Sequence, residues 1–148
     1  VIAPTRRSPL AAWPGVVDVP AAIAGLRAAR PGVAHQVGVG DAERVDDHEG
    51  ALAALAGERR PGLLIACAGR PDALRAAYGH WTTVIRRSRT GMLMAGCTDV
   101  DGDVLGELLP RRRPMPPRPG LAWVVAAGRS ALVQVGLDGP PSRPVNRM

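Results

Sequence analysis

The sequence predicts an α/β domain in which a mostly parallel sheet carries helices on both faces and ends in an antiparallel hairpin. Three observations support this fold class. Short apolar runs alternate with segments whose apolar residues recur at helical spacing. The run at 63–68 is apolar throughout, as in a buried parallel strand. Two late apolar runs, at 121–126 and 131–135, flank the turn residues 127–130, which is typical of a hairpin.

In the first half of the chain, each strand pattern is followed by a helical pattern. Ser8 is placed to cap a short helix that begins at Pro9, and Asp47 is placed to cap a later one. The expected elements are a helix at 9–13, a strand at 16–19, a helix at 20–30, a strand at 33–39 and a helix at 48–57.

The second half continues this alternation. Its expected elements are a strand at 63–68, helices at 71–79 and 81–87, a strand at 91–95, a short apolar segment at 105–109 and the hairpin. A loop rich in Pro and Arg, at 110–120, precedes the hairpin, and a Pro-rich tail follows it. We therefore expect one domain at 1–137 and a disordered tail at 138–148.

The basic residues of this chain are unusual in kind. All 19 are arginine, so the chain contains no lysine, and the formal net charge is +6. A phosphate-binding P-loop needs a lysine that reaches the phosphates, which excludes a self-sufficient P-loop nucleotidase. The positive charge also fits nucleic-acid binding, but a modest surplus of charge on an arginine-biased surface is the better explanation.

The cysteines and the apolar pattern bear on the compartment. Neither Cys67 nor Cys97 has a second Cys or His at metal-ligand spacing, so we expect free thiols in a reducing compartment and no metal site. No apolar stretch reaches bilayer-spanning length, and the start lacks a signal-peptide pattern. We expect a cytoplasmic chain that does not insert into the membrane, a location that also fits a longer, membrane-anchored protein.

Ligands of open α/β sheets bind at the carboxyl ends of the strands. The loops that follow residues 39, 68 and 94 are therefore the candidate positions. The first of these loops holds four carboxylates, namely Asp41, Glu43, Asp46 and Asp47. Carboxylates in such a place handle Mg²⁺ and an attacking water in nucleotide hydrolysis. A solvated acidic turn with a helix cap is the simpler interpretation.

Three other motifs are weaker. Gly38 and Gly40 match part of a dinucleotide fingerprint, but Glu43 replaces the third glycine and would repel a pyrophosphate. The histidines are scattered, no Gly-x-Ser-x-Gly elbow exists, and His80 beside Trp81 is expected to pack at a helix junction. The basic run at 86–90 fits either a solvated helix end or an anion contact.

The order and spacing of several short motifs resemble a known family. The motifs are ACAGR at 66–70, YGHW at 78–81, RRSRTGML at 86–93, DGDVLG at 101–106, LPRR at 109–112 and LVQV at 132–135. Together they resemble the C-terminal part of an ATPase domain of the FtsK/SpoIIIE type, above all the actinobacterial EccC ATPases of type VII secretion. The resemblance covers roughly the last 120 residues before the tail.

This resemblance implies a RecA-like sheet and an incomplete P-loop NTPase domain. It places the Walker B strand at 33–39 and the sensor strand at 63–68. The two acidic Walker B positions fall on Gly40 and Asp41, with Glu43 in the following turn, so Asp41 and Glu43 are the catalytic candidates. The Ser-Arg-Thr element at 88–90 makes Arg89 a candidate contact to a neighbouring subunit's nucleotide, and Arg70 is a second nucleotide-binding candidate. The family's late Pro-Gly-Arg-Gly turn is altered at 117–120.

A complete member of the family binds ATP and Mg²⁺, and we expect neither for the isolated chain, which lacks the P-loop. The loss of an acid at Gly40 favours a degenerate domain that acts in assembly, regulation or substrate recognition of a DNA-translocation or type VII secretion motor. The implied partners are other subunits or modules of the same ATPase, in a homo-oligomeric ring, and DNA or a secreted protein. Two alternatives stay open: the C-terminal half of an active ATP-hydrolysing motor domain whose P-loop lies upstream, and a basic DNA-binding module.

Overall fold

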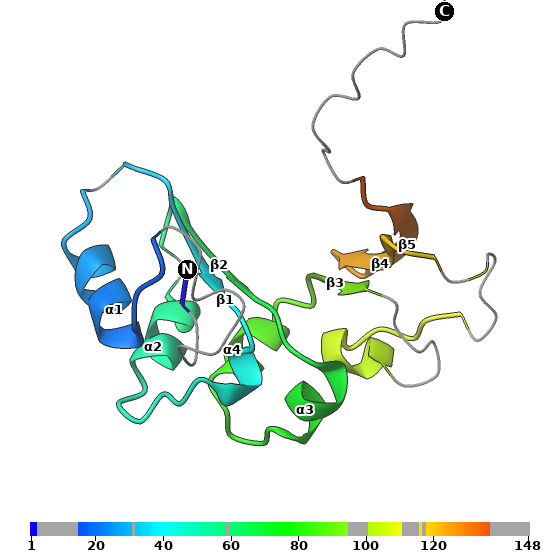
Figure 1. The fold of residues 1–148 in the computed structure, drawn as a ribbon, viewed down its shortest axis with the longest axis horizontal. Coiled ribbons are helices and arrows are strands. Elements are labelled where there is room, and N and C mark those ends of the chain that lie inside the picture. The colour runs from blue at the N-terminus through cyan, green and yellow to red at the C-terminus, as the bar shows by residue number, and fades with distance from the viewer. Residues whose placement is uncertain are drawn as a thin grey trace, which may run out of the picture.

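The computed structural model describes residues 1–2, 15–30, 32–58, 60–94, 101–110, 116 and 118–136. The helix expected at 9–13, Cys97, the tail at 138–148 and much of the Pro/Arg loop lie outside these residues. In chain order the elements are α1 (Val19–Arg27), β1 (His35–Val39), η2 (Ala42–Arg44), α2 (Ala51–Gly57), β2 (Leu63–Cys67), α3 (Pro71–Ala76), α4 (Thr82–Arg86), β3 (Gly91–Met94), η3 (Asp101–Leu105), β4 (Leu121–Ala126) and β5 (Arg129–Gln134). The α/β class and the C-terminal hairpin are confirmed (Figure 1).

The strands β1 and β2 form a parallel pair, in register from His35 opposite Leu63 to Val39 opposite Cys67. One face of this pair is apolar on both strands and packs against helices. The buried residues of this core are Ile2, Ile23, Leu26, Val37, Val39, Ala42, Val45, Leu52, Leu55 and Trp81. The core therefore joins β1 to α1, α2 and the start of α4, and it fixes the loop that follows β1.

The strand expected at 16–19 is wrong. Among the described residues Val17 forms an isolated bridge to Ile2, and Val19 already belongs to α1. The reason is local, because the Asp18 carboxylate accepts a hydrogen bond of 2.8 Å from the Ala21 amide and Pro20 fits the first helical turn. Ile2 also bridges to Val39, so the beginning of the chain lies along the edge of β1 that β2 does not occupy.

Asp47 caps α2 as predicted, but from a greater distance along the chain. Its two carboxylate oxygens accept hydrogen bonds from the amides of Leu52, at 2.9 Å, and Ala53, at 2.8 Å. The helix begins at Ala51 rather than at 48, because Gly50 adopts a left-handed φ of 67° and interrupts the helical backbone before it.

The remaining strands form a second sheet of order β3-β4-β5, antiparallel throughout. Figure 1 shows this sheet apart from β1 and β2. The hairpin turn is two residues rather than four, because Ala127 and Gly128 both have positive φ, as a tight turn between twisted strands requires. A second core of Leu93, Leu105, Leu109, Trp123 and Val125 packs on this sheet.

Each sheet has exposed apolar side chains on its second face. On β2, Leu64 is 57% exposed and Ala66 is exposed, although the run at 63–68 predicted a buried strand. On β3, Met92 and Met94 are exposed by 49% and 53%. The described helices of the first core cover only the opposite face of β1 and β2, which explains why the apolar run is not buried here.

Candidate functional site

The carboxyl ends of β1 and β2 are held together beyond the strands themselves. The amide of Ala68 donates to the carbonyl of Val39 at 2.8 Å, and the amide of Ala42 donates to the carbonyl of Ala68 at 2.9 Å. The loop that follows β1 and the loop that follows β2 are therefore neighbours, at the edge of the sheet where α/β proteins bind ligands.

Glu43 is the most unusual side chain at this edge. Its side chain is only 6% exposed, and its Oε1 accepts a hydrogen bond of 3.3 Å from Arg70 Nε. Its Oε2 is buried and has no hydrogen-bond partner in the described structure. A buried carboxylate oxygen without a donor is costly, and such oxygens are rare in folded proteins.

Gly69 makes room for this carboxylate. A Cβ at Gly69 would clash with Glu43 Oε2 and would lie 3.3 Å from the side chain of Leu74 on α3. The absence of a side chain at 69 thus allows Glu43 to lie under the loop that carries Arg70. The sequence motifs indicate Glu43 and Arg70 as separate candidates and do not predict their contact. The only signal for it was a Gly-Arg pair after one strand and a carboxylate after the neighbouring strand.

Asp41 lies in the same loop but in a different state. It adopts a left-handed φ of 45°, is half-buried, and its carbonyl accepts from the Arg44 amide at 2.8 Å as η2 begins. Left-handed backbone in a non-glycine residue is uncommon outside Asn and Asp, and it clusters at functional sites. The structure thus brings Asp41, Glu43 and Arg70 to one edge.

The remaining carboxylates of the acidic loop have ordinary roles. Asp47 caps α2. Asp46 Oδ2 lies 3.8 Å from His48 Nε2, and both side chains are largely exposed, so this pair contributes little to stability. The interpretation as an acidic turn with a helix cap holds for Asp46 and Asp47, whereas burial separates Glu43 from them.

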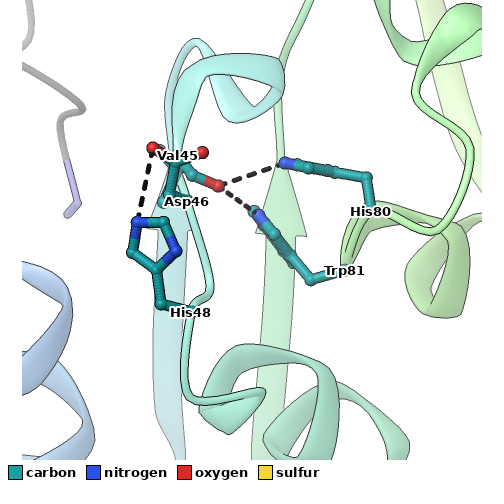
Figure 2. Close-up of polar contacts among 5 residues, drawn as sticks. All are labelled: Val45, Asp46, His48, His80 and Trp81. Atoms are coloured by element: carbon teal, nitrogen blue, oxygen red, sulfur yellow. Dashed lines mark hydrogen bonds and ion pairs between the residues drawn. The ribbon is translucent and has the colours of Figure 1, made fainter.

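The carbonyl of Val45 anchors the end of the acidic loop (Figure 2). It accepts from Trp81 Nε1 at 2.8 Å and from His80 Nε2 at 3.1 Å. Because His80 Nε2 must carry a proton to donate, Nδ1 is the acceptor in its 2.9 Å contact with the Thr82 hydroxyl. The predicted packing role of His80 at a helix junction agrees with this geometry, which ties the acidic loop to the start of α4.

The basic run at 86–90 divides into two parts. Arg86 is structural, since its guanidinium donates to the carbonyls of Leu74, at 2.8 Å, and Val104, at 3.1 Å. Arg89 is exposed, has a left-handed φ of 49°, and lies against Gly106. Within the described part of the chain, no hydrogen bond or ion pair joins Arg89 to Asp41, Glu43 or Arg70.

The described residues contain no group of three or more His, Cys, Asp and Glu side chains that could hold a metal ion. A carboxylate edge of this kind would need further ligands, such as phosphate oxygens, to bind Mg²⁺. Burial raises the pKa of the half-buried Cys67 thiol above its ordinary value of 9.0. None of the described helices is long and apolar enough to cross a membrane.

Comparison with known proteins identifies the fold. No family model and no curated protein matches the sequence. The fold is similar to EssC (ATPases 2 and 3) from Geobacillus thermodenitrificans, with a TM-score of 0.61 and 15% identity over 90% of this chain and 30% of that one. It is also similar to the cytoplasmic domain of EssC, with a TM-score of 0.56 and 13% identity over 90% of this chain and 32% of that one.

The chain thus spans about a third of the length of the EssC structures that it matches. Each match covers 90% of this chain. This likeness in fold agrees with the ATPase-type α/β fold that the sequence motifs predict. The chain therefore has the fold of part of an EssC-type ATPase domain.

Proposed function

We propose that this chain is the C-terminal portion of a degenerate FtsK/SpoIIIE-like ATPase domain that serves in assembly, regulation or substrate recognition of a type VII secretion or DNA-translocation motor. The observation that carries the proposal is the state of the acidic edge within an ATPase-type fold. The position where the family has its first acidic residue is Gly40, and the buried Glu43 is paired with Arg70.

The electrostatics of this edge support a non-catalytic role. A general base or a water-orienting carboxylate must reach the attacking water directly. One oxygen of Glu43 instead accepts a hydrogen bond from Arg70, and the other is buried away from solvent. The chain also has no lysine to contact the phosphates. ATP and Mg²⁺ are accordingly expected only in a complete, active domain of the family.

The exposed apolar side chains on the second faces of the two sheets favour a role inside a larger assembly. Leu64, Met92 and Met94 expose apolar side chains on the second faces of the two sheets. Sheets with two apolar faces are normally covered on both. We propose that other modules or subunits of the same ATPase supply this cover, in a ring on the cytoplasmic side of the membrane, and that the cargo is DNA or a secreted protein.

The first experiment is an ATP hydrolysis assay on the purified chain, with Glu43→Gln as the matched variant. The proposal predicts no turnover above a buffer blank for either protein. Turnover by the unaltered chain that Glu43→Gln abolishes would contradict the non-catalytic role. Turnover that survives in Glu43→Gln would indicate a contaminating ATPase.

One alternative has an observation in its favour. The unpartnered Oε2 of Glu43 and the left-handed Asp41 also suit the C-terminal half of an active motor domain that is completed by an upstream P-loop. In that case Asp41 and Glu43 act in hydrolysis, and Arg89 contacts the nucleotide of a neighbouring subunit. Arg89→Ala in the full-length enzyme should then lower turnover strongly. Unchanged turnover would exclude that role for Arg89.

A further inference from the structure

The two cores of this chain are built from successive stretches of the sequence. The residues of the first core, with the apolar residues packed against it, run from Ile2 to Ile85, and those of the second run from Leu93 to Leu132. No described residue belongs to both cores. The described chain therefore passes from one core to the other only through residues 87–90, which join α4 to β3 (Figure 1).

The connecting segment 87–90 is exposed along its whole length. Its third residue, Arg89, has a left-handed φ of 49°, which is uncommon for a residue other than Gly, Asn or Asp. The hydroxyl of Thr90 donates to the carbonyl of Ser88 at 3.2 Å, and the amide of Thr90 donates to the Ser88 hydroxyl at 3.3 Å, so these hydrogen bonds stay within the segment. A short exposed segment of this kind can change its φ and ψ angles without disturbing either core.

The two halves meet where α3 and α4 contact η3, and arginine side chains make the polar contacts there. Arg86, at the end of α4, donates from Nη1 to the carbonyl of Leu74 at 2.8 Å and from Nε to the carbonyl of Val104 at 3.1 Å. Arg75 Nη2 lies 3.3 Å from Asp101 Oδ1. Leu74 and Val104 are buried, but neither belongs to a core cluster. Units that are joined by a polar junction outside their cores commonly move relative to one another.

The hydrogen bonding of this junction is incomplete. Arg75 Nε is buried and has no hydrogen-bond partner in the described structure, which raises the free energy of the joined arrangement. The side chains of Arg75 and Asp101 are exposed by 35% and 15%, so water partly screens their attraction. Arg86 has the opposite effect, because it supplies donors to two carbonyls at once, one of them near the end of α3, where a helix has no donors of its own. The junction therefore depends mainly on Arg86.

We propose that the two cores form two units that rotate about the segment 87–90, and that Arg86 is the latch that holds them in the arrangement seen here. This inference goes beyond the proposed function and does not depend on it. Leu64 is exposed on the first unit, and Met92 and Met94 are exposed on the second. Rotation changes the relative orientation of these apolar side chains, so a partner that contacts both units selects one arrangement.

The test measures the distance between the two units by double electron–electron resonance. Spin labels are attached to Ala24→Cys on α1 and Ala131→Cys on β5, because both positions are exposed and lie on different units. The measurements are made in a Cys67→Ser, Cys97→Ser background, so that no other thiol is labelled. With the latch unaltered, the distance distribution should be narrow.

Arg86→Ala should broaden this distribution, because the carbonyls of Leu74 and Val104 lose their donor and the two units are released. Arg87→Ala is the matched control, since it removes an exposed arginine from the next position at the same helix end, and it should leave the distribution narrow. Arg86→Lys keeps the charge but lacks the planar fork that reaches both carbonyls, so its distribution should be intermediate in width.

The indole N–H signals of Trp81 and Trp123 show whether the cores stay folded, because Trp81 belongs to the first core and Trp123 to the second. Nuclear magnetic resonance of unlabelled Arg86→Ala should show both signals at their folded chemical shifts. Loss of either signal would overturn the proposal, because Arg86 would then be needed within a core. The proposal would also fail if the unaltered chain gave a broad distribution, if Arg86→Ala stayed narrow, or if Arg87→Ala broadened the distribution as much as Arg86→Ala.

Discussion

Trp81 and His80 share one acceptor, and this makes a strong prediction about stability. The Val45 carbonyl belongs to a residue that is 3% exposed, and it accepts from both side chains. Trp81→Phe removes one donor and part of a ring that is 4% exposed. The lost hydrogen bond lowers the free energy of unfolding by about 1 kcal/mol and the smaller ring by about 1–2 kcal/mol. The substitution should therefore lower it by about 2–3 kcal/mol in total.

His80→Ala should lower the free energy of unfolding by only about 1–2 kcal/mol, because Trp81 still donates a hydrogen bond to the Val45 carbonyl. The double variant leaves that carbonyl buried without a donor, which adds a penalty of about 1–3 kcal/mol. The effects of the two substitutions should therefore be non-additive, with the double variant less stable than the sum predicts by at least about 1 kcal/mol.

The assay is urea unfolding of the four proteins, followed by circular dichroism, with the free energy extrapolated to water. Trp123→Phe combined with His80→Ala is the control, because Trp123 belongs to the second core and shares no partner with His80. That pair should be additive within about 0.5 kcal/mol. Equal additivity in the Trp81 and His80 pair would refute the idea that the Val45 carbonyl depends on either donor.

Three further predictions concern other parts of the fold. Asp47→Ala should lower the free energy of unfolding by about 1–2 kcal/mol, since two amides of α2 lose their acceptor. Asp47→Asn should lower it less. Equal effects of the two substitutions in thermal melts would argue against the cap. In a Cys97→Ser background, alkylation of Cys67 should be slow at neutral pH, because burial raises the pKa of the folded thiol. The free energy of unfolding should fall as the pH rises past 9.0, because the unfolded thiol ionises before the folded one. Rapid alkylation of the folded chain would contradict this. Leu64→Arg should change the free energy of unfolding by no more than about 0.5 kcal/mol, and it should reduce self-association measured by light scattering. A large loss of stability would mean that the face of β2 that carries Leu64 is packed.

Residues of similar appearance in the sequence have different roles in the structure. The carboxylates at 41–47 form one acidic cluster in the sequence, and spacing alone favoured a solvated turn for all of them. Asp47 follows that expectation because helix capping depends on a few neighbouring residues. Glu43 departs from it because Gly69 and Arg70, which lie 26 and 27 positions further along the chain, surround its carboxylate.

The strands show the same division. The apolar residues at 63–68 predict a strand, and its parallel pairing with β1 agrees with the strand–helix–strand alternation. The same apolar residues predict a fully buried strand, but Leu64 is exposed because burial depends on what covers each face. Likewise, β3 was expected as a strand, but its antiparallel pairing with β4 follows from a core that joins Leu93 to Trp123.

The sequence by itself determined the α/β class, the positions of most strands and helices, the Asp47 cap and the lack of a P-loop lysine, because each depends on residue type or on short-range periodicity. Tertiary structure decided which strands pair, which apolar faces stay open, and which carboxylate loses its solvent and meets Arg70. The physical reason is that burial and hydrogen-bond partners arise from contacts between distant segments, and residue spacing does not encode those contacts directly.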